Sequence, residues 1–190
     1  PRVALNIGGL TRYANYVSGS GTSALVFEYT IAAGNNSNGI SLGGNVDLNG
    51  GTVRDAAGNA LNLAVGASGA TSTVVVDTIA PQVRDIVRIF TSPTSAEVVV
   101  YKVTFDESVS GVDTADFSVV FSGTANGRLA SVTRIDGRTY EVRVDNLTGT
   151  GNVRLDLNGS GTGIVDAAGN PVTGGLAGSI YSIDRDAPSV

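Results

Sequence analysis

The chain of 190 residues contains no cysteine, histidine, methionine or tryptophan, and Lys102 is its only lysine. Without histidine or cysteine, zinc and most transition-metal sites lose their preferred ligands. The same absence excludes Ser-His and Cys-His nucleophile pairs, and a Ser-Lys pair would need Lys102, which lies in a strand pattern. Disulfide bonds are excluded as well. The composition therefore argues against an enzyme, and we expect no catalytic residue.

Basic residues and long apolar runs are also scarce. The chain has 12 Lys and Arg against 17 Asp and Glu, a net charge of −5 at pH 7, so it offers no basic face for nucleic acid. No segment approaches the roughly 18 continuous apolar residues of a membrane helix, and we expect no membrane span. Thirteen of the acidic residues are Asp, whose short carboxylate suits turns and oxygen-binding cations.

Short alternating apolar runs are what the chain has in abundance, together with 26 glycines. In residues 98–105 (VVVYKVTF) and 139–145 (TYEVRVD) every second residue is apolar, the period of a strand with one buried face. Asp136-Gly137 is a hairpin signal, because glycine tolerates positive φ. No helical period is sustained, so we expect an all-β chain. Seven strands are expected in its second half, near 83–90, 97–105, 116–122, 128–135, 139–145, 152–157 and 179–184.

Two signatures occur twice. Residues 53–59 (VRDAAGN) return as 164–170 (IVDAAGN), and residues 76–83 (VDTIAPQV) return as 183–190 (IDRDAPSV). Asp166 follows Asp55 by 111 positions (166 − 55), and Asp184 follows Asp77 by 107 (184 − 77). Such self-similarity indicates two modules in series. We expect modules at 1–77 and 83–184, a linker at 78–82 and the start of a further linker at 185–190.

The first module is the shorter one. Its expected strands correspond to the third to seventh strands of the second module and lie near 2–7, 11–17, 25–31, 46–48 and 73–76. We expect the first two strands to be missing, which leaves an open edge where another chain could pair. The alternative is that Pro1 begins a shorter but complete domain.

Seven short strands in about 100 residues fit an immunoglobulin-like sandwich. The segments DAAGN and VDxxAPxV, with residues 105–109 (FDESV) and 12–22 (RYANYVSGSGT), resemble bacterial immunoglobulin-like tandem repeats of large calcium-dependent surface adhesins and secreted repeat proteins. The resemblance implies tandem β-sandwich modules in an extended array, a secreted or cell-surface location, neighbouring repeats of the same polypeptide as partners, and Ca²⁺ at the junctions. Residues 105–108 read FDES where FSEP is frequent in that family, which keeps the family Glu as Glu107 and adds Asp106.

The alternating direction of consecutive strands, here called strand parity, predicts which acidic residues lie close together. Consecutive antiparallel strands alternate in direction, so the loops that follow 97–105 and 152–157 lie at the end of the module nearest the linker. Asp77, Glu107 and Asp166 are the main candidates for a Ca²⁺ site there, because their mutual repulsion is relieved by a cation that binds six to eight oxygens. The lesser candidates are Asp106, Asp113 and Asn170. By repeat equivalence, Asp184 and Asp186 begin the next junction and Asp55 belongs to the previous one.

Local explanations of the same residues stay open. Asp55 and Asp166 could cap turns through Asx hydrogen bonds. Asp77 and Asp184 could be ordinary strand-end residues. Asp106 and Asp113 could be solvated.

The predicted function is a non-catalytic structural repeat that extends a large bacterial surface or secreted protein and is rigidified by calcium. The alternatives are a module that binds a glycan or protein, and a self-assembling surface-layer or fibre subunit. Paired carboxylates also occur in glycosidases, but no aromatic sugar platform accompanies them here.

Overall fold

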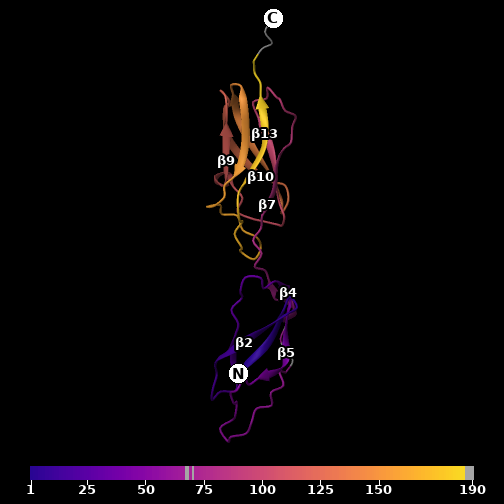
Figure 1. The fold of residues 1–190 in the computed structure, drawn as a ribbon, viewed down its shortest axis with the longest axis vertical. Helices are drawn as coiled ribbons and strands as arrows, with labels where there is room; N and C mark the ends of the chain where they lie inside the picture. Colours follow the sequence, from indigo (N-terminus) through magenta and orange to yellow (C-terminus); the bar gives the residue numbers. More distant parts are fainter. Residues whose placement is uncertain (67–68, 70, 187–190) are drawn as a thin grey trace. The chain divides into compact units, whose positions relative to one another are not determined.

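The computed structural model describes residues 1–66, 69 and 71–186, and the chain divides into two compact units, Pro1–Ile79 and Ala80–Val190 (Figure 1). The division falls inside residues 78–82. The described residues contain no α-helix, only the short 3₁₀ helices η1 (Thr71–Thr73) and η2 (Thr114–Asp116), and the all-β prediction is confirmed. No helix among them is long and apolar enough to cross a membrane. Of the expected further linker at 185–190, residues 187–190 lie outside the described part.

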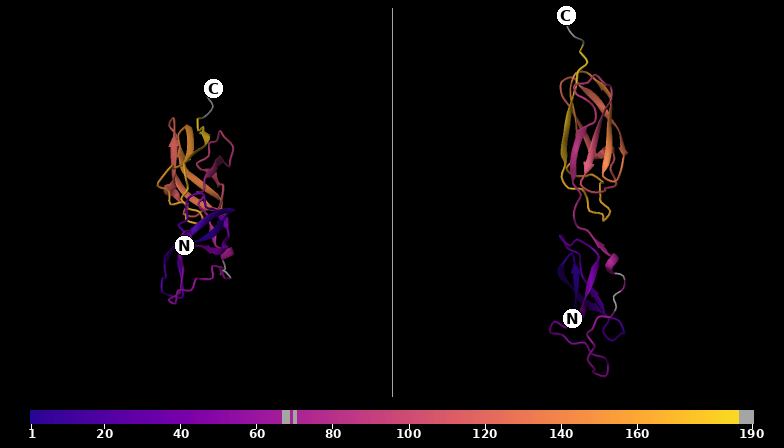
Figure 2. Two further views of the ribbon diagram at one scale, coloured as in Figure 1. Left: turned by 60° about the horizontal axis from the view of Figure 1, so that its bottom comes forward. Right: turned by 90° about the vertical axis from the view of Figure 1, so that its right-hand side faces the viewer.

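The second unit contains all seven strands expected between residues 83 and 184. They form two antiparallel sheets, ordered β10-β11-β8-β7 and β13-β12-β9, which Figure 2 shows as two facing layers. The strands are β7 (Val83–Arg88), β8 (Val99–Phe105), β9 (Phe117–Phe121), β10 (Asn126–Arg134), β11 (Thr139–Thr148), β12 (Gly151–Leu157) and β13 (Leu176–Ile183).

The core of the second unit lies between these two sheets. Every second residue of β8, from Val99 to Phe105, is at most 1% exposed, as the sequence alternation predicts. The rings of Tyr101 and Tyr181 pack edge to face with centroids 5.2 Å apart. Their hydroxyl groups remain paired in the apolar interior, because Tyr101 donates to the Val153 carbonyl at 2.7 Å and Tyr181 donates to the Val100 carbonyl at 2.9 Å. The tyrosines thus join the two sheets by both packing and hydrogen bonds.

The hairpin expected at Asp136-Gly137 joins β10 to β11, but its physical basis differs from the expectation. Gly137 is not among the residues with positive φ. The Asp136 carboxylate instead accepts the backbone N–H groups of Arg138 and Thr139 at 2.7 and 2.9 Å. The turn is therefore stabilised by the aspartate side chain, not by a left-handed glycine.

The described residues of the first unit form one four-stranded antiparallel sheet and one two-stranded sheet. The larger sheet has the order β3-β2-β1-β5, and β4 pairs with β6 in the smaller one. Gly8 and Gly9, with φ of 59° and 82°, form the turn between β1 and β2, where paired positive φ values suit a tight hairpin. The strands are β1 (Arg2–Ile7), β2 (Leu10–Ser18), β3 (Val26–Glu28), β4 (Ser37–Asn38), β5 (Ile40–Asp47) and β6 (Val75–Val76).

Strand pairing in the first unit departs from the expected equivalence with the second. β13 pairs with β12, but its counterpart β6 pairs with β4 and not with β5. The edge of β5 that does not pair with β1 is taken by residues 63–65. Val46 donates its backbone N–H to the Leu63 carbonyl at 2.7 Å, and Val65 donates to the Gly44 carbonyl at 2.9 Å. Residues 63–65 thus take the place beside β5 that the sequence interpretation gave to residues 73–76.

The first unit also buries fewer apolar side chains. Among the described residues of the first unit, only Val3, Ile7, Ala14 and Val76 are buried hydrophobic residues, whereas the core of the second unit comprises eighteen buried residues. Because buried apolar area is the main source of folding free energy, the second unit carries the more stable core.

Candidate metal centre

The segment that joins the two units begins directly after β6. Asp77 follows Val76, and its Oδ1 accepts the backbone N–H of Ile79 at 2.9 Å. This i to i+2 contact is an Asx-type bond that shapes the start of the segment. Further along, the Pro81 carbonyl accepts the backbone N–H of Thr173 at 3.2 Å, which ties the segment to the loop between β12 and β13.

Asp106, a predicted ligand, fixes the end of the same segment. Its Oδ1 accepts the Gln82 N–H at 2.8 Å, and its own N–H donates to the Gln82 carbonyl at 3.0 Å. In the structure, Asp106 thus connects the joining segment to the end of β8 through two hydrogen bonds to the Gln82 backbone. It does not belong to the acidic cluster described below.

Asp166 organises the tight turn that its repeated signature forms. Its Oδ1 accepts the backbone N–H groups of Ala168 and Asn170, both at 2.8 Å, and its Oδ2 accepts the Asn170 side-chain amide at 2.7 Å. Burial alone would raise the pKa of this carboxyl group, but the hydrogen bonds from Asn170, Ala168 and Gly169 outweigh burial, and the pKa lies below the usual 3.8. The side chain is thus held as an anion.

Asp55 forms the same turn in the first unit. Its Oδ1 accepts the backbone N–H groups of Ala57 and Asn59 at 2.9 and 2.8 Å, and its Oδ2 accepts the Asn59 amide at 2.8 Å. Gly58 closes the turn with a φ of 89°, and Gly169 closes the other turn with a φ of 90°. Asp55 therefore has a full structural role as a turn residue, the local alternative that the sequence left open.

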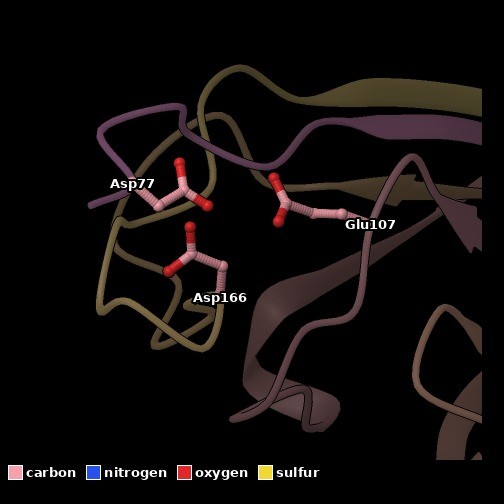
Figure 3. Close-up of side chains that lie close together, drawn as sticks. All are labelled: Asp77, Glu107 and Asp166. Carbon is pink, nitrogen blue, oxygen red and sulfur yellow. The ribbon is translucent and has the colours of Figure 1, made fainter. Parts of the chain in front are cut away.

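Three carboxylates converge where the joining segment meets the second unit. Asp77, Glu107 and Asp166 each place one oxygen so that the three atoms lie within 4.8 Å of one another, and Figure 3 shows their carboxylate groups facing a common point. Asp77 and Glu107 are half-buried and Asp166 is buried. Two unit charges 4 Å apart repel by about 1 kcal/mol in water and by about 4 kcal/mol near a protein surface. A cation bound among the three carboxylates would relieve this repulsion.

The remaining candidates lie outside this cluster of acidic groups. Asp113 is the N-cap of η2, where it accepts the Ala115 N–H at 2.7 Å. Asp184 accepts the Asp186 N–H at 3.1 Å, and both residues are exposed. Asn170 touches the cluster through its hydrogen bond to Asp166. In the described residues, Asp77, Glu107 and Asp166 are the only group of three acidic side chains near enough to share an ion.

The chemistry of the donor set matches a hard cation. All three groups offer anionic oxygen atoms, and neither a sulfur nor an imidazole ligand exists in this chain. Calcium accepts six to eight oxygen ligands, including carboxylates and amide or backbone carbonyls. Magnesium demands a stricter octahedral shell and retains more water. Three converging carboxylates beside an asparagine therefore fit calcium better than magnesium.

Sequence reasoning missed the residues that hold the start of the joining segment. The Thr78 backbone N–H and hydroxyl group both donate to Oδ1 of Asn36, at 2.7 and 3.2 Å, and the Thr78 hydroxyl accepts the Gly34 N–H at 2.9 Å. These contacts anchor the residue next to Asp77 within the first unit. The only signal in the sequence is the polar run 35–38, which carries no information about its distant partner.

Comparisons with known proteins give little support for any assignment. No protein-family model and no curated protein sequence matches this chain. Among solved structures, the N-terminal part of the bacterial S-layer protein SbsC is similar over 58% of this chain and 25% of its own, with 19% identity and a TM-score of 0.37. A similarity at this level identifies neither a family nor a function.

Proposed function

We propose that this chain is a non-catalytic structural segment of a secreted or cell-surface bacterial protein, built from immunoglobulin-like modules in series and stiffened by Ca²⁺ where the modules join. The observation that carries the proposal is the convergence of Asp77, Glu107 and Asp166 at the joining segment. An ion held there would connect a residue of the joining segment to two loops of the second unit.

The strand order of the second unit supports an immunoglobulin-like module. If β7 to β13 are lettered A to G, the sheets read DEBA and GFC, which is the arrangement of an immunoglobulin constant-type domain. The turns at Asp55 and Asp166, which share the same hydrogen bonds, support a duplicated module. The first unit follows this plan less closely, because β1 and β2 pair directly in it.

The location of the acidic cluster argues for mechanical restraint and not for chemistry. Glu107 and Asp166 lie in loops at one end of the second unit, and Asp166 is already engaged by its own turn. Despite burial, the hydrogen bonds of its turn lower the pKa of Asp166, so this carboxylate is ionised and suits a cation. A cation that binds the folded chain but not the unfolded chain stabilises the fold by the free energy of its binding.

Thermal unfolding with calcium and with a chelator tests this proposal. At a free calcium concentration of 100 times Kd, binding should stabilise the cooperative unit that includes the site by about 2.7 kcal/mol. A chelator should therefore lower its melting temperature by several degrees. Magnesium at the same concentration should restore less of this loss than calcium.

Two variants test whether the calcium-dependent stabilisation comes from Asp77, Glu107 and Asp166. Asp77→Asn combined with Glu107→Gln removes two charges but keeps an Oδ1 at residue 77 for the Ile79 N–H, and the turn around Asp166 stays unaltered. This variant should melt at the same temperature with calcium and with chelator. Glu28→Gln, which changes an exposed carboxylate of the first unit, should retain the full calcium response. An equal response in both variants would assign the effect to general screening and contradict the proposal.

A further inference from the structure

The sheet edges of the second unit differ in how they are protected from pairing with another strand. The described sheets end in β10 and β7 and in β13 and β9. The edges of β7 and β13 face each other across two hydrogen bonds. The Arg88 guanidinium donates to the Ile180 carbonyl at 2.8 Å, and the Ser179 hydroxyl group donates to the Ile86 carbonyl at 3.3 Å. Each of these two edges therefore already has a neighbour.

The edge of β10 is protected by charge and by irregular pairing. Its Arg128 and Arg134 side chains are exposed. Its register with β11 shifts between Asn126 and Arg128 and shifts again between Leu129 and Ser131. Charged side chains and bulges on an edge strand oppose pairing with a further strand. Of the described edges in this unit, only that of β9 remains to be explained.

β9 has none of these protections. Its residues 117–121 read FSVVF, with no charged residue and no proline, and it pairs with β12 without a register shift. Among the described strands, β12 is its only partner (Figure 1). Val120 is 44% exposed, and Val119 and Phe121 are half-buried. A regular, uncharged and apolar edge of this kind is a template for another strand.

The pairing with β12 determines which backbone groups of β9 face outward. The Ser122 N–H donates to the Asn152 carbonyl at 3.0 Å. Hydrogen-bonded and non-hydrogen-bonded pairs alternate along an antiparallel ladder, so Val120 also bonds β12. The N–H and C=O groups of Val119 and Phe121 consequently point away from β12, toward the open side of the strand.

We propose that β9 is the edge through which two copies of this chain associate, paired antiparallel about a two-fold axis at Val119. The axis places Val119 opposite Val119 of the second copy, and these two residues exchange N–H···O bonds. Phe121 then donates its N–H to the Phe117 carbonyl of the second copy. The Phe117 N–H is not required, since it donates to the Thr114 carbonyl within its own chain. One edge thus supplies both sides of the contact, as a two-fold interface requires.

The charges beside β9 favour a second copy in this orientation. On the outer face of the sheet, β12 places Arg154 next to Val120 and Asp156 next to Ser118. The axis puts Ser118 opposite Val120 of the second copy, so every cross-strand row at the contact contains one Asp156 and one Arg154. A parallel contact would align Asp156 with Asp156 and Arg154 with Arg154. The antiparallel pair is therefore the electrostatically complementary one.

Sedimentation equilibrium of the full chain, up to about 1 mM, the Kd range of weak pairing, tests the association. We expect a monomer–dimer equilibrium. Two variants are matched, because Val120 and Ile180 are 44% and 48% exposed and lie in one cross-strand row with Arg154 between them. Val120→Lys should weaken the dimer by about tenfold or more, since a lysine on an edge strand opposes edge pairing. Ile180→Lys, on β13, should leave it unchanged. A monomeric wild type, or equal effects of both variants, would overturn the proposal.

Cysteine variants test the register in a chain that has no cysteine of its own. The proposed axis puts Ser118 opposite Val120 of the second copy in a pair without hydrogen bonds, with Cα atoms about 4.5 Å apart, which is within disulfide range. Identical residues lie diagonally, about 7–8 Å apart. A mixture of Ser118→Cys and Val120→Cys chains should therefore form the mixed disulfide faster than either variant alone forms its own. Equal rates would contradict the register.

Amide hydrogen exchange locates the contact without any substitution. Raising the concentration of the full chain should slow exchange at Val119 and Phe121, whose N–H groups face outward. Exchange at Ser118 and Val120 should stay the same, because β12 already binds their N–H groups. Slowing confined to another edge, such as Val26–Glu28 of the first unit, would place the contact elsewhere and overturn the proposal.

Discussion

The side-chain amide of Asn170 donates to Oδ2 of Asp166 at 2.7 Å, and this bond closes a turn that Asn59 and Asp55 reproduce at 2.8 Å in the first unit. The two turns differ in burial, since Asp166 is 5% exposed and Asp55 lies on the surface. A hydrogen bond to a charged group contributes more when it is shielded from water. The same signature therefore stabilises the second unit more than the first.

Replacing the two asparagines measures this difference. Asn170→Ala should destabilise the second unit by about 1.5–3 kcal/mol, the range for a hydrogen bond to a charged group. Asn59→Ala should destabilise the first unit by less, because water can solvate the exposed Asp55. Denaturant unfolding followed separately for each unit provides the measurement. A larger loss for Asn59→Ala would show that burial does not set the strength of this turn.

Stability should depend on pH with opposite signs at Asp166 and Asp116. The pKa of Asp166 is lowered from 3.8, so its stabilising contribution is present above 3.8 and is lost as pH falls through its lower folded value. Burial raises the pKa of Asp116, which the hydrogen bond from the Asp113 N–H only partly offsets. Ionisation of Asp116 therefore lowers stability above its raised pKa, and this loss disappears as pH falls toward 3.8.

Asparagine variants separate these two contributions. Relative to the wild type, Asp116→Asn should become less stable as the pH is lowered from 7 to 4, because it lacks the gain from protonation. Asp166→Asn should instead approach the wild type as the pH falls below 3.8. The free energy of unfolding, measured for each variant across this range, checks both signs. Parallel curves for the two variants would contradict the assignment.

Core substitutions should also affect the two units unequally. Leu157 is 3% exposed, and Leu48, which occupies the same place in the repeated segment LNG, is half-buried. Leu157→Ala should cost about 2–5 kcal/mol, the range for a buried leucine. Leu48→Ala should cost clearly less, because part of that side chain already contacts water. Urea unfolding of both variants, read from each unit, tests this comparison.

The sequence predicts the second unit well because four of its strands, β8, β9, β11 and β12, alternate with a clear period of two. Residues 97–105 alternate so regularly that burial of Val99, Tyr101 and Val103 follows directly. In the first unit the expected strands near 2–7 and 11–17 are present, but the strand expected near 46–48 is β5 at Ile40–Asp47, and β4 was not expected. Which edge a strand occupies depends on competitors far along the chain, such as residues 63–65 beside β5, and local alternation contains no information about them.

For the acidic residues, too, the sequence predicts one part of the structure and not the other. Strand parity indicates which loops share one end of a module, and the structure brings Asp77, Glu107 and Asp166 together. Parity does not indicate where a short side chain points. Asp113 turns back to cap η2, and Asp106 bonds the Gln82 backbone, because an aspartate reaches nearby N–H groups more readily than a distant ion. That the three gathered carboxylates bind calcium stays a prediction.

Isothermal titration of calcium into the full chain measures directly whether Asp77, Glu107 and Asp166 form a calcium site. We expect a saturable site occupied by millimolar free calcium, weaker binding of magnesium, and loss of the site in the variant that combines Asp77→Asn with Glu107→Gln. The exposed control Glu28→Gln should titrate like the wild type. Absence of binding to the wild-type chain at millimolar calcium, or equal binding by the double variant, would show that these carboxylates do not form a calcium site.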